Sequence, residues 1–133
     1  MKTIILLLGM TMLVGCNLLD SSIIIDPPNA PTINVCENVA TDEDVVVMKD
    51  KIESQAFKDE RMERAKTVTK DYCFEAYQVV DIMDSFQFED AKLEIAKHLY
   101  GDTTDKENYD IVVDALVHKG DRDDLRAYIA NYN

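Results

Sequence analysis

The 133-residue chain contains very little proline or glycine, the two residues that most often interrupt helices. Its three prolines all fall within residues 27–31, and after Thr41 glycine occurs only at Gly101 and Gly120. The chain from Thr41 onward is therefore well suited to a succession of helices. No serine sits in a glycine elbow, and Cys73 has no local catalytic signature. We accordingly expect no catalytic residue and no enzymatic activity.

Basic residues are also few, because 14 lysines and arginines stand against 26 acids and give a formal net charge of −12. Such a surface repels nucleic-acid phosphates and anionic lipid head groups. We therefore expect no nucleic-acid partner. Any attachment to a membrane must come from a covalent lipid.

The chain lacks an apolar run of the roughly 20 residues that are needed to cross a bilayer. It begins instead with the shorter pattern of a secretory signal, in which basic Lys2 precedes an apolar stretch over residues 3–14 and the small residue Gly15. Residues 1–15 are predicted to be a signal peptide.

The signal ends in "LVGC" (residues 13–16), which resembles the lipobox of bacterial lipoproteins at all four positions. The resemblance implies that Cys16 becomes the first residue of the mature protein and carries a diacylglycerol and an acyl chain such as palmitate. No other cofactor is expected. Each buried methylene of these chains contributes about 0.8 kcal/mol to membrane anchoring. The alternative is an ordinary secreted protein in which Cys16 is a buried cysteine.

Removal of residues 1–15 takes away one lysine and no acid, so 13 basic residues would face 26 acidic ones and the formal charge would be −13. Asn17, which would follow the lipidated cysteine, does not lead at once into the acidic cluster that surface-exported lipoproteins of such bacteria tend to show. We therefore expect a cell-envelope protein of the outer membrane that faces the periplasm.

Residues 16–40 contain all three prolines and are predicted to form an extended tether between the lipid and a folded domain. Isoleucines 23–25 are too apolar for a free linker, so part of the tether is expected to lie on the domain, pinned through Cys36. In an oxidising envelope Cys36 and Cys73 would form a disulfide that stabilises the fold by about 3–4 kcal/mol. Two inert, buried thiols are the alternative.

Residues 41–133 are predicted to form an all-α domain of six short helices, because apolar residues recur there at the spacing of one helix face. The valine run over residues 45–47 would also suit a strand. The six apolar stripes contain Val45, Met48, Ile52 and Ala56; Met62, Ala65, Val68, Thr69 and Tyr72; Ala76, Val79, Val80 and Met83; Leu93, Ala96, Leu99 and Tyr100; Tyr109, Val112, Val113 and Leu116; and Leu125, Tyr128, Ile129 and Tyr132.

An internal repeat relates these helices to one another. "AFKDERMERAK" (residues 56–66) matches "QFEDAKLEIAK" (residues 87–97) at a constant offset of 31 residues. A fainter third copy over residues 121–128 places Leu125 where Leu93 stood, with one residue inserted. Two helices per repeat predict stacked helical hairpins, which bury their apolar faces only against their neighbours.

Local signals predict where individual helices begin and end. Phe57 and Phe88 each precede an apolar residue by five positions, the spacing of a hydrophobic staple. Residues 104–107 read as a capping box in which Thr104 and Glu107 would satisfy backbone amides. Gly101 and Gly120 are each expected just past a helix end, and Asp121 is expected to cap the start of the last helix.

The run "SFQFEDAKLEIAKHLYGDTTDKENYDIVVDAL", with Gln78 upstream and "DDLRAYI" downstream, resembles domain of unknown function 4476. This small helical domain occurs in envelope lipoproteins of Bacteroidetes-like bacteria and in some animal proteins, and the resemblance covers roughly residues 54–129. The family tends to have threonine or serine at the start of the third helix, where this chain has Phe74, Glu75 and Ala76. The resemblance implies no activity and no functional residue.

No metal site is expected from residue spacing. His98 and His118 have no second histidine or cysteine at ligand distance, although Glu94 lies one turn before His98. The acidic loops starting at Asp102 and Asp121 do not follow the ligand order of a calcium-binding loop. A small calcium-binding or hydrolytic envelope protein that uses these loops nevertheless stays the alternative function.

Tyrosine is the most abundant aromatic residue of the predicted domain, which has no tryptophan. Tyr77 falls off the apolar stripe of its helix, and Tyr132 lies at the C-terminal end. Tyrosine is enriched at protein interfaces, although half-buried packing is its commoner role. We therefore expect a non-enzymatic interaction module for another envelope protein, with Tyr77 and Tyr132 as candidate interface residues. A purely structural spacer is a third alternative.

Overall fold

The computed structural model of the protein describes residues 36–133. The predicted signal peptide (1–15), the lipidation residue Cys16 and most of the predicted tether (16–40) lie outside the described residues. The all-α prediction is confirmed, and valines 45–47 are helical. Within residues 36–133 the helices are α1 (Asp42–Glu53), α2 (Lys58–Thr69), α3 (Ala76–Met83), α4 (Glu89–Leu99), the 3₁₀ helix η1 (Lys106–Asn108), α5 (Asp110–Asp114) and α6 (Lys119–Ala130).

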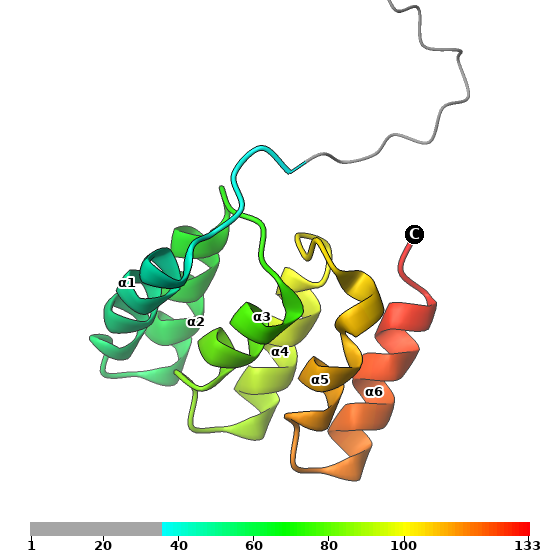
Figure 1. Cartoon of the computed structure of the whole chain (residues 1–133). Helices are drawn as coiled ribbons and strands as arrows, with labels where there is room; N and C mark the ends of the chain where they lie inside the picture. Colours follow the sequence, from blue (N-terminus) through cyan, green and yellow to red (C-terminus); the bar gives the residue numbers. More distant parts are fainter. Residues whose placement is uncertain (1–35) are drawn as a thin grey trace, which may run out of the picture. The chain divides into compact units, whose positions relative to one another are not determined.

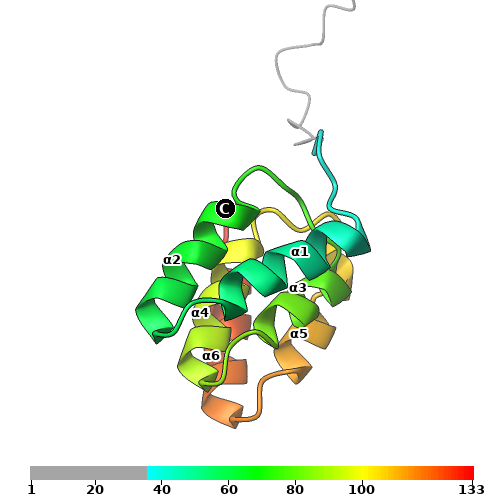
Figure 2. The same cartoon turned by 90° about the vertical axis from the view of Figure 1, so that its left-hand side faces the viewer.

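The helices stack as hairpins, as the internal repeat predicted (Figure 1). α1 packs on α2, α3 on α4 and α5 on α6. Between hairpins, α3 contacts both α1 and α5, whereas α4 contacts both α2 and α6. The domain therefore has two layers, one made of α1, α3 and α5 and the other of α2, α4 and α6, which lie side by side in the view of Figure 2.

One apolar core lies between the two layers and takes side chains from all six α-helices. The residues that are fully shielded from solvent follow the helical spacing of each element, so the core is built from one face of every helix. Its largest fully buried members include Ile52, Phe74, Ile82, Ile95, Leu99, Tyr109, Leu116 and Leu125.

The repeat has a slightly different register from the predicted one. The second helix of each hairpin follows an N-cap residue at an equivalent position: Phe57, Phe88 and His118. In this register Leu125 corresponds to the buried Ile95, and not to the half-buried Leu93 as predicted. The third repeat is therefore one residue shorter, with no residue inserted.

The predicted hydrophobic staples are wrong. Phe57 and Phe88 are themselves the N-cap residues of α2 and α4, one position later than a staple requires. Their rings are 69% and 58% exposed, so neither is held against the following turn of helix. Both phenylalanines instead project from the turns that join the two helices of a hairpin.

Short extended segments join the hairpins at the opposite end of the helices. Val39 pairs with Cys73, and Phe74 pairs with Thr103, both in parallel. Backbone hydrogen bonds of 2.8–3.0 Å connect these segments. Three extended segments, which precede α1, α3 and η1 respectively, thus lie side by side and are joined by these two bridges. We call this arrangement the inter-hairpin ladder.

The predicted capping box over residues 104–107 is also wrong. The Thr104 hydroxyl donates instead to the carbonyl oxygen of Phe74 at 3.2 Å, and η1 has no side-chain cap. Asp105 caps a different helix, because its Oδ1 accepts the backbone N–H of Ala76, the first residue of α3, at 2.7 Å. The start of α3 is therefore capped twice, by a capping box of its own between Glu75 and Gln78 and by Asp105, which lies 29 residues beyond Ala76.

Gly120 and Asp121 do not mark the start of α6 either. They lie inside the helix, whose N-cap is His118. Arg122 Nη1 donates to the carbonyl oxygen of Leu116 at 2.7 Å, which fixes the hairpin turn before α6. This short-range contact, between residues six apart in the sequence, accompanies a helix start that the local signals did not predict. No helix within residues 36–133 is long and apolar enough to span a bilayer.

Candidate functional site

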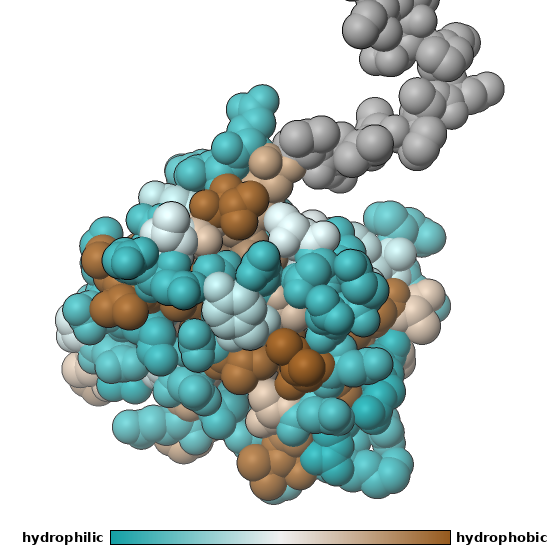
Figure 3. All heavy atoms as spheres, in the orientation of Figure 1, coloured by the Kyte–Doolittle hydropathy of each residue, from teal (hydrophilic) through white to brown (hydrophobic). Residues whose placement is uncertain are grey.

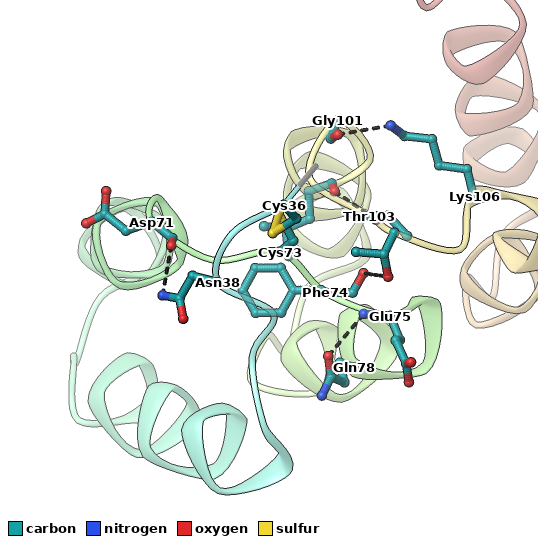
Figure 4. Close-up of a disulfide and its surroundings, with 12 residues drawn as sticks. Cys36, Asn38, Asp71, Cys73, Phe74, Glu75, Gln78, Gly101, Thr103 and Lys106 are labelled. Atoms are coloured by element: carbon teal, nitrogen blue, oxygen red, sulfur yellow. Dashed lines mark hydrogen bonds between the residues drawn. A yellow bond between two sulfur atoms is a disulfide. The ribbon is translucent and has the colours of Figure 1, made fainter. Parts of the chain in front are cut away.

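Cys36, the first residue that the structure describes, is joined covalently to the extended segment before α3 (Figure 4). Cys36 and Cys73 form a disulfide with their Cα atoms 6.1 Å apart, a usual separation for bridged cysteines. Asn38 Nδ2 adds a hydrogen bond of 3.1 Å to the carbonyl oxygen of Asp71. The described end of the tether is thereby fixed between the first and second hairpins.

Gln78 holds the next residues of the same segment. Its side chain is 2% exposed, and its Nε2 donates to the carbonyl oxygen of Ala40 at 2.9 Å and to Asp42 Oδ1 at 3.2 Å. Its Oε1 accepts the backbone N–H of Glu75 at 3.0 Å. The side-chain amide of Gln78 therefore forms hydrogen bonds with backbone or side-chain groups at the start of both α3 and α1. These bonds require both a donor and an acceptor at this position.

Tyr77 belongs to the same cluster. Its hydroxyl donates to Asp42 Oδ1 at 2.7 Å while 43% of the residue stays exposed. This hydrogen bond lowers the pKa of Asp42, with a smaller effect from Gln78, and raises the pKa of Tyr77 to about 12. Tyr77 is thus a half-exposed ring with a fixed orientation, at the N-terminal ends of α1 and α3.

Tyr132 lies in a separate aromatic cluster near the C-terminus. Its ring packs edge-on to Tyr100, with centroids 5.0 Å apart, and also contacts Tyr128. Lys106 Nζ lies 5.5 Å from the centroid of Tyr100 and 5.9 Å from that of Tyr132. A Cβ at Gly101 would require the Tyr132 hydroxyl to shift, and the backbone of Gly101 is not left-handed.

The structure does not bring the two candidate interface tyrosines together. Tyr77 contacts α1 at the start of the odd-numbered layer, whereas Tyr132 packs against the end of α4. The hairpin turns carry a further set of exposed apolar residues: Phe57 and Phe88 at equivalent repeat positions, and Val117 one position before the equivalent His118. A shallow cavity of about 150 Å³ lies between the first two turns.

The acidic loops are engaged in the fold. The backbone carbonyl of Asp102 accepts the N–H of Phe74, and Asp105 caps α3. Asp123 forms ion pairs with Lys119 and Arg126. Within residues 36–133 no three histidine, cysteine or carboxylate side chains gather as they would around a metal ion.

Sequence reasoning missed Gln78 as a structural residue, although Gln78 formed part of the family resemblance. The sequence does hold a signal for this role. Gln78 lies beside the apolar stripe of a short helix, and a polar side chain that is buried there needs hydrogen-bond partners. The capping role of Asp105 could not be read from the sequence, because its partner Ala76 lies 29 residues away.

Comparison with known proteins gives one match. The model of the family described as "Domain of unknown function (DUF4476)" matches residues 39–129, and it therefore takes in all of α1 as well as the expected region. No curated protein and no solved structure matches the chain.

Proposed function

This chain belongs to the DUF4476 family, and on that premise we propose that it is a lipid-anchored protein of the cell envelope whose helical domain binds another envelope protein. The domain is non-enzymatic in this proposal, because its ordered polar groups serve the fold. The anchor is the diacylglycerol and acyl chain on Cys16, and the domain faces the periplasm from the outer membrane.

The observation that carries the envelope assignment is the Cys36–Cys73 disulfide. Structural disulfides persist in oxidising compartments and are rare in the reducing cytosol. The bridge also lies 20 residues after the "LVGC" motif, at the point where a lipid-bound tether would enter the domain. Export, lipidation and oxidation are therefore mutually consistent.

Lipidation is tested by growing cells that express the full-length chain with labelled palmitate. The wild-type protein should incorporate label and remain in the membrane fraction, and Cys16→Ala should lose the label. Cys36→Ala is the matched control, because it removes a cysteine of the same chain and should keep the label. Equal labelling of Cys16→Ala and wild type would contradict the anchor.

The orientation is tested by protease shaving of intact cells. A periplasm-facing domain should resist the protease until the outer membrane is permeabilised. Rapid loss of the domain from intact cells would place it on the outside instead.

Binding is tested by chemical crosslinking of membranes that contain the full-length protein, followed by purification through a C-terminal tag. A saturable, reproducible crosslinked species is expected. Recovery of the uncrosslinked protein alone would favour a structural spacer.

Calorimetry with calcium and with zinc tests the ion-binding alternative, for which heat of binding and a shift in melting temperature would be required.

A further inference from the structure

The two helical layers differ sharply in charge. Helices α2, α4 and α6 carry nine acidic and nine basic residues, so their layer is formally neutral. Helices α1, α3 and α5 carry eight acidic residues against two basic ones, and α3 and α5 contain no basic residue at all. Within the helices, the negative charge of the domain is therefore concentrated on one layer. We call the outward surfaces of the two layers the odd face (α1, α3, α5) and the even face (α2, α4, α6).

Ion pairing follows the same division. Lys58 and Lys66 of α2 pair across to Asp90 and Glu94 of α4, and further pairs lie within α4 and α6. Among residues 36–133, the one ion pair that reaches an odd-numbered helix joins Asp114 at the end of α5 to α6. The even face thus pairs many of its charges internally. Lys49 and Lys51 of α1 are the only basic residues on the helices of the odd face, and neither forms an ion pair within residues 36–133.

The odd face also exposes apolar side chains between these carboxylates. Val46 lies one turn after Asp42, whose carboxylate contacts α3, so Val46 is on the side of α1 that faces α3. Val46 is 58% exposed, and Ile111 of α5 is 46% exposed. Val80 of α3 is half-buried against the core. Figure 3 shows this face, with apolar surface beside α5 surrounded by hydrophilic surface.

On α1 and α3, charged and apolar side chains alternate from one turn to the next. On α3, Tyr77 and Asp81 lie one turn apart and are both exposed. On α1, Val46 and Asp50 stand in the same relation. A ligand of this face must therefore neutralise carboxylates and cover apolar side chains at the same time.

We propose that the odd face is the binding surface for the envelope partner, and that the partner contributes a basic segment whose lysines or arginines alternate with apolar residues. This inference rests on the proposed function, because it assigns the surface and the chemistry of that interaction. Asp50 and Asp81 form ion pairs with the lysines or arginines of the partner segment, while Tyr77 and Ile111 pack against its apolar side chains.

Charge excludes the other occupants. Two copies of this chain would place like charges opposite one another across such an interface, and anionic lipids or nucleic acids would be repelled. A simple metal ion would leave the apolar side chains uncovered. Complementary charge also accelerates association, so the interaction should weaken as the salt concentration rises.

The surface is tested by site-specific photocrosslinking in cells that express the full-length protein. The photoreactive amino acid p-benzoylphenylalanine replaces either Tyr77 or Ile111 on the odd face. Control variants carry it at Arg64 or Thr67, which are both exposed on α2. Irradiation should give a defined adduct from the odd-face positions, and mass spectrometry should map it to a partner segment with net positive charge.

Charge dependence is tested in the Ile111 photocrosslinking variant. The pair Asp50→Asn and Asp81→Asn should lower the adduct yield on the order of fivefold, as expected for the loss of two surface ion pairs. The pair Asp59→Asn and Glu60→Gln on α2 changes the net charge equally and should leave the yield unchanged. An equal loss from both pairs would show that only the total charge matters, which overturns the proposed surface.

The outcomes separate this inference from the proposed function. Adducts from Arg64 or Thr67 alone would place the partner on the even face, which overturns the inference while the interaction module stands. Mapping of the odd-face adduct to an acidic segment, or to a second copy of this chain, would also overturn it. Absence of adducts from all four positions would contradict the interaction module itself.

Discussion

At the scale of single residues, the start of α1 and the start of α3 depend on one buried amide. Gln78 donates two hydrogen bonds and accepts a third, and its partners belong to the end of the tether, to α1 and to the N-cap of α3. A buried polar group that loses its partner costs about 1–3 kcal/mol.

Replacement of Gln78 by methionine is expected to destabilise the protein by about 1–3 kcal/mol, because the carbonyl oxygen of Ala40 loses a donor and the N–H of Glu75 loses an acceptor. Urea unfolding followed by circular dichroism measures the change. Gln87→Met is the matched control, since Gln87 lies exposed in a hairpin turn. Equal stability of the two variants would contradict this role.

The Tyr77–Asp42 hydrogen bond predicts an unusual titration. The pKa of Tyr77 is raised to about 12, so the protonated phenol is favoured by the fold, and the stability from this interaction is complete below the ordinary tyrosine pKa of about 10. It should be lost as the pH rises through about 12. Carbon NMR of labelled tyrosine rings measures the titration, and Asp42→Asn should return the Tyr77 pKa toward 10.

At the scale of secondary-structure elements, the apolar spacing of the sequence was sufficient to predict six helices, and the internal repeat predicted their pairing into hairpins. Most stripes mark the buried face of their helix, but in α4 the buried residue is Ile95 and the predicted Leu93 is half-buried. The ends of the helices were harder. Asp105 caps α3 across 29 residues, so this boundary depends in part on a contact that no local motif contains.

The candidate site was predictable only in part for the same reason. Cys36 and Cys73 could be named as partners, but their distance depends on the inter-hairpin ladder, which has no sequence signature of its own. Tyr77 was selected because it lies off an apolar stripe, yet its hydrogen bond to Asp42 required the packing of α3 on α1. The charge difference between the two layers becomes visible only when alternate helices are grouped.

Reduction of the Cys36–Cys73 disulfide is expected to lower the free energy of unfolding by about 3–4 kcal/mol, because the bridge closes a segment with a sequence separation of 37 residues. Thermal unfolding with and without a reductant measures the loss. The double variant Cys36→Ser and Cys73→Ser should match the reduced wild type, and its stability should not respond to the reductant. A wild-type protein that does not respond either would contradict the bridge.

At the scale of the whole molecule, the charge of the odd face should oppose folding. Asp50 and Asp81 lie in the last turns of α1 and α3, where a negative charge also opposes the helix dipole. The pair Asp50→Asn and Asp81→Asn should therefore stabilise the isolated protein by about 0.3–1 kcal/mol for each residue. Such a gain would mean that the acids are retained at a cost in stability.

The measurement is the melting temperature at low and at high salt. The gain should shrink at about 1 M salt, where charges are screened within roughly 3 Å. The control pair Asp59→Asn and Glu60→Gln should not stabilise, because both acids lie in the first turn of α2 and favour its dipole. Stabilisation by both pairs alike would contradict a special role for the odd face.

The disulfide also decides how the molecule responds to mechanical force. A pull on the chain before Cys36 passes through the bridge to Cys73 and bypasses α1 and α2, so the first hairpin bears no load. Forced extension of the oxidised protein should release about 130 Å less contour than the reduced one, since a separation of 37 residues stays closed at roughly 3.5 Å each. Optical tweezers would measure this difference directly. A domain held by its N-terminal segment would thus keep its first hairpin folded under tension.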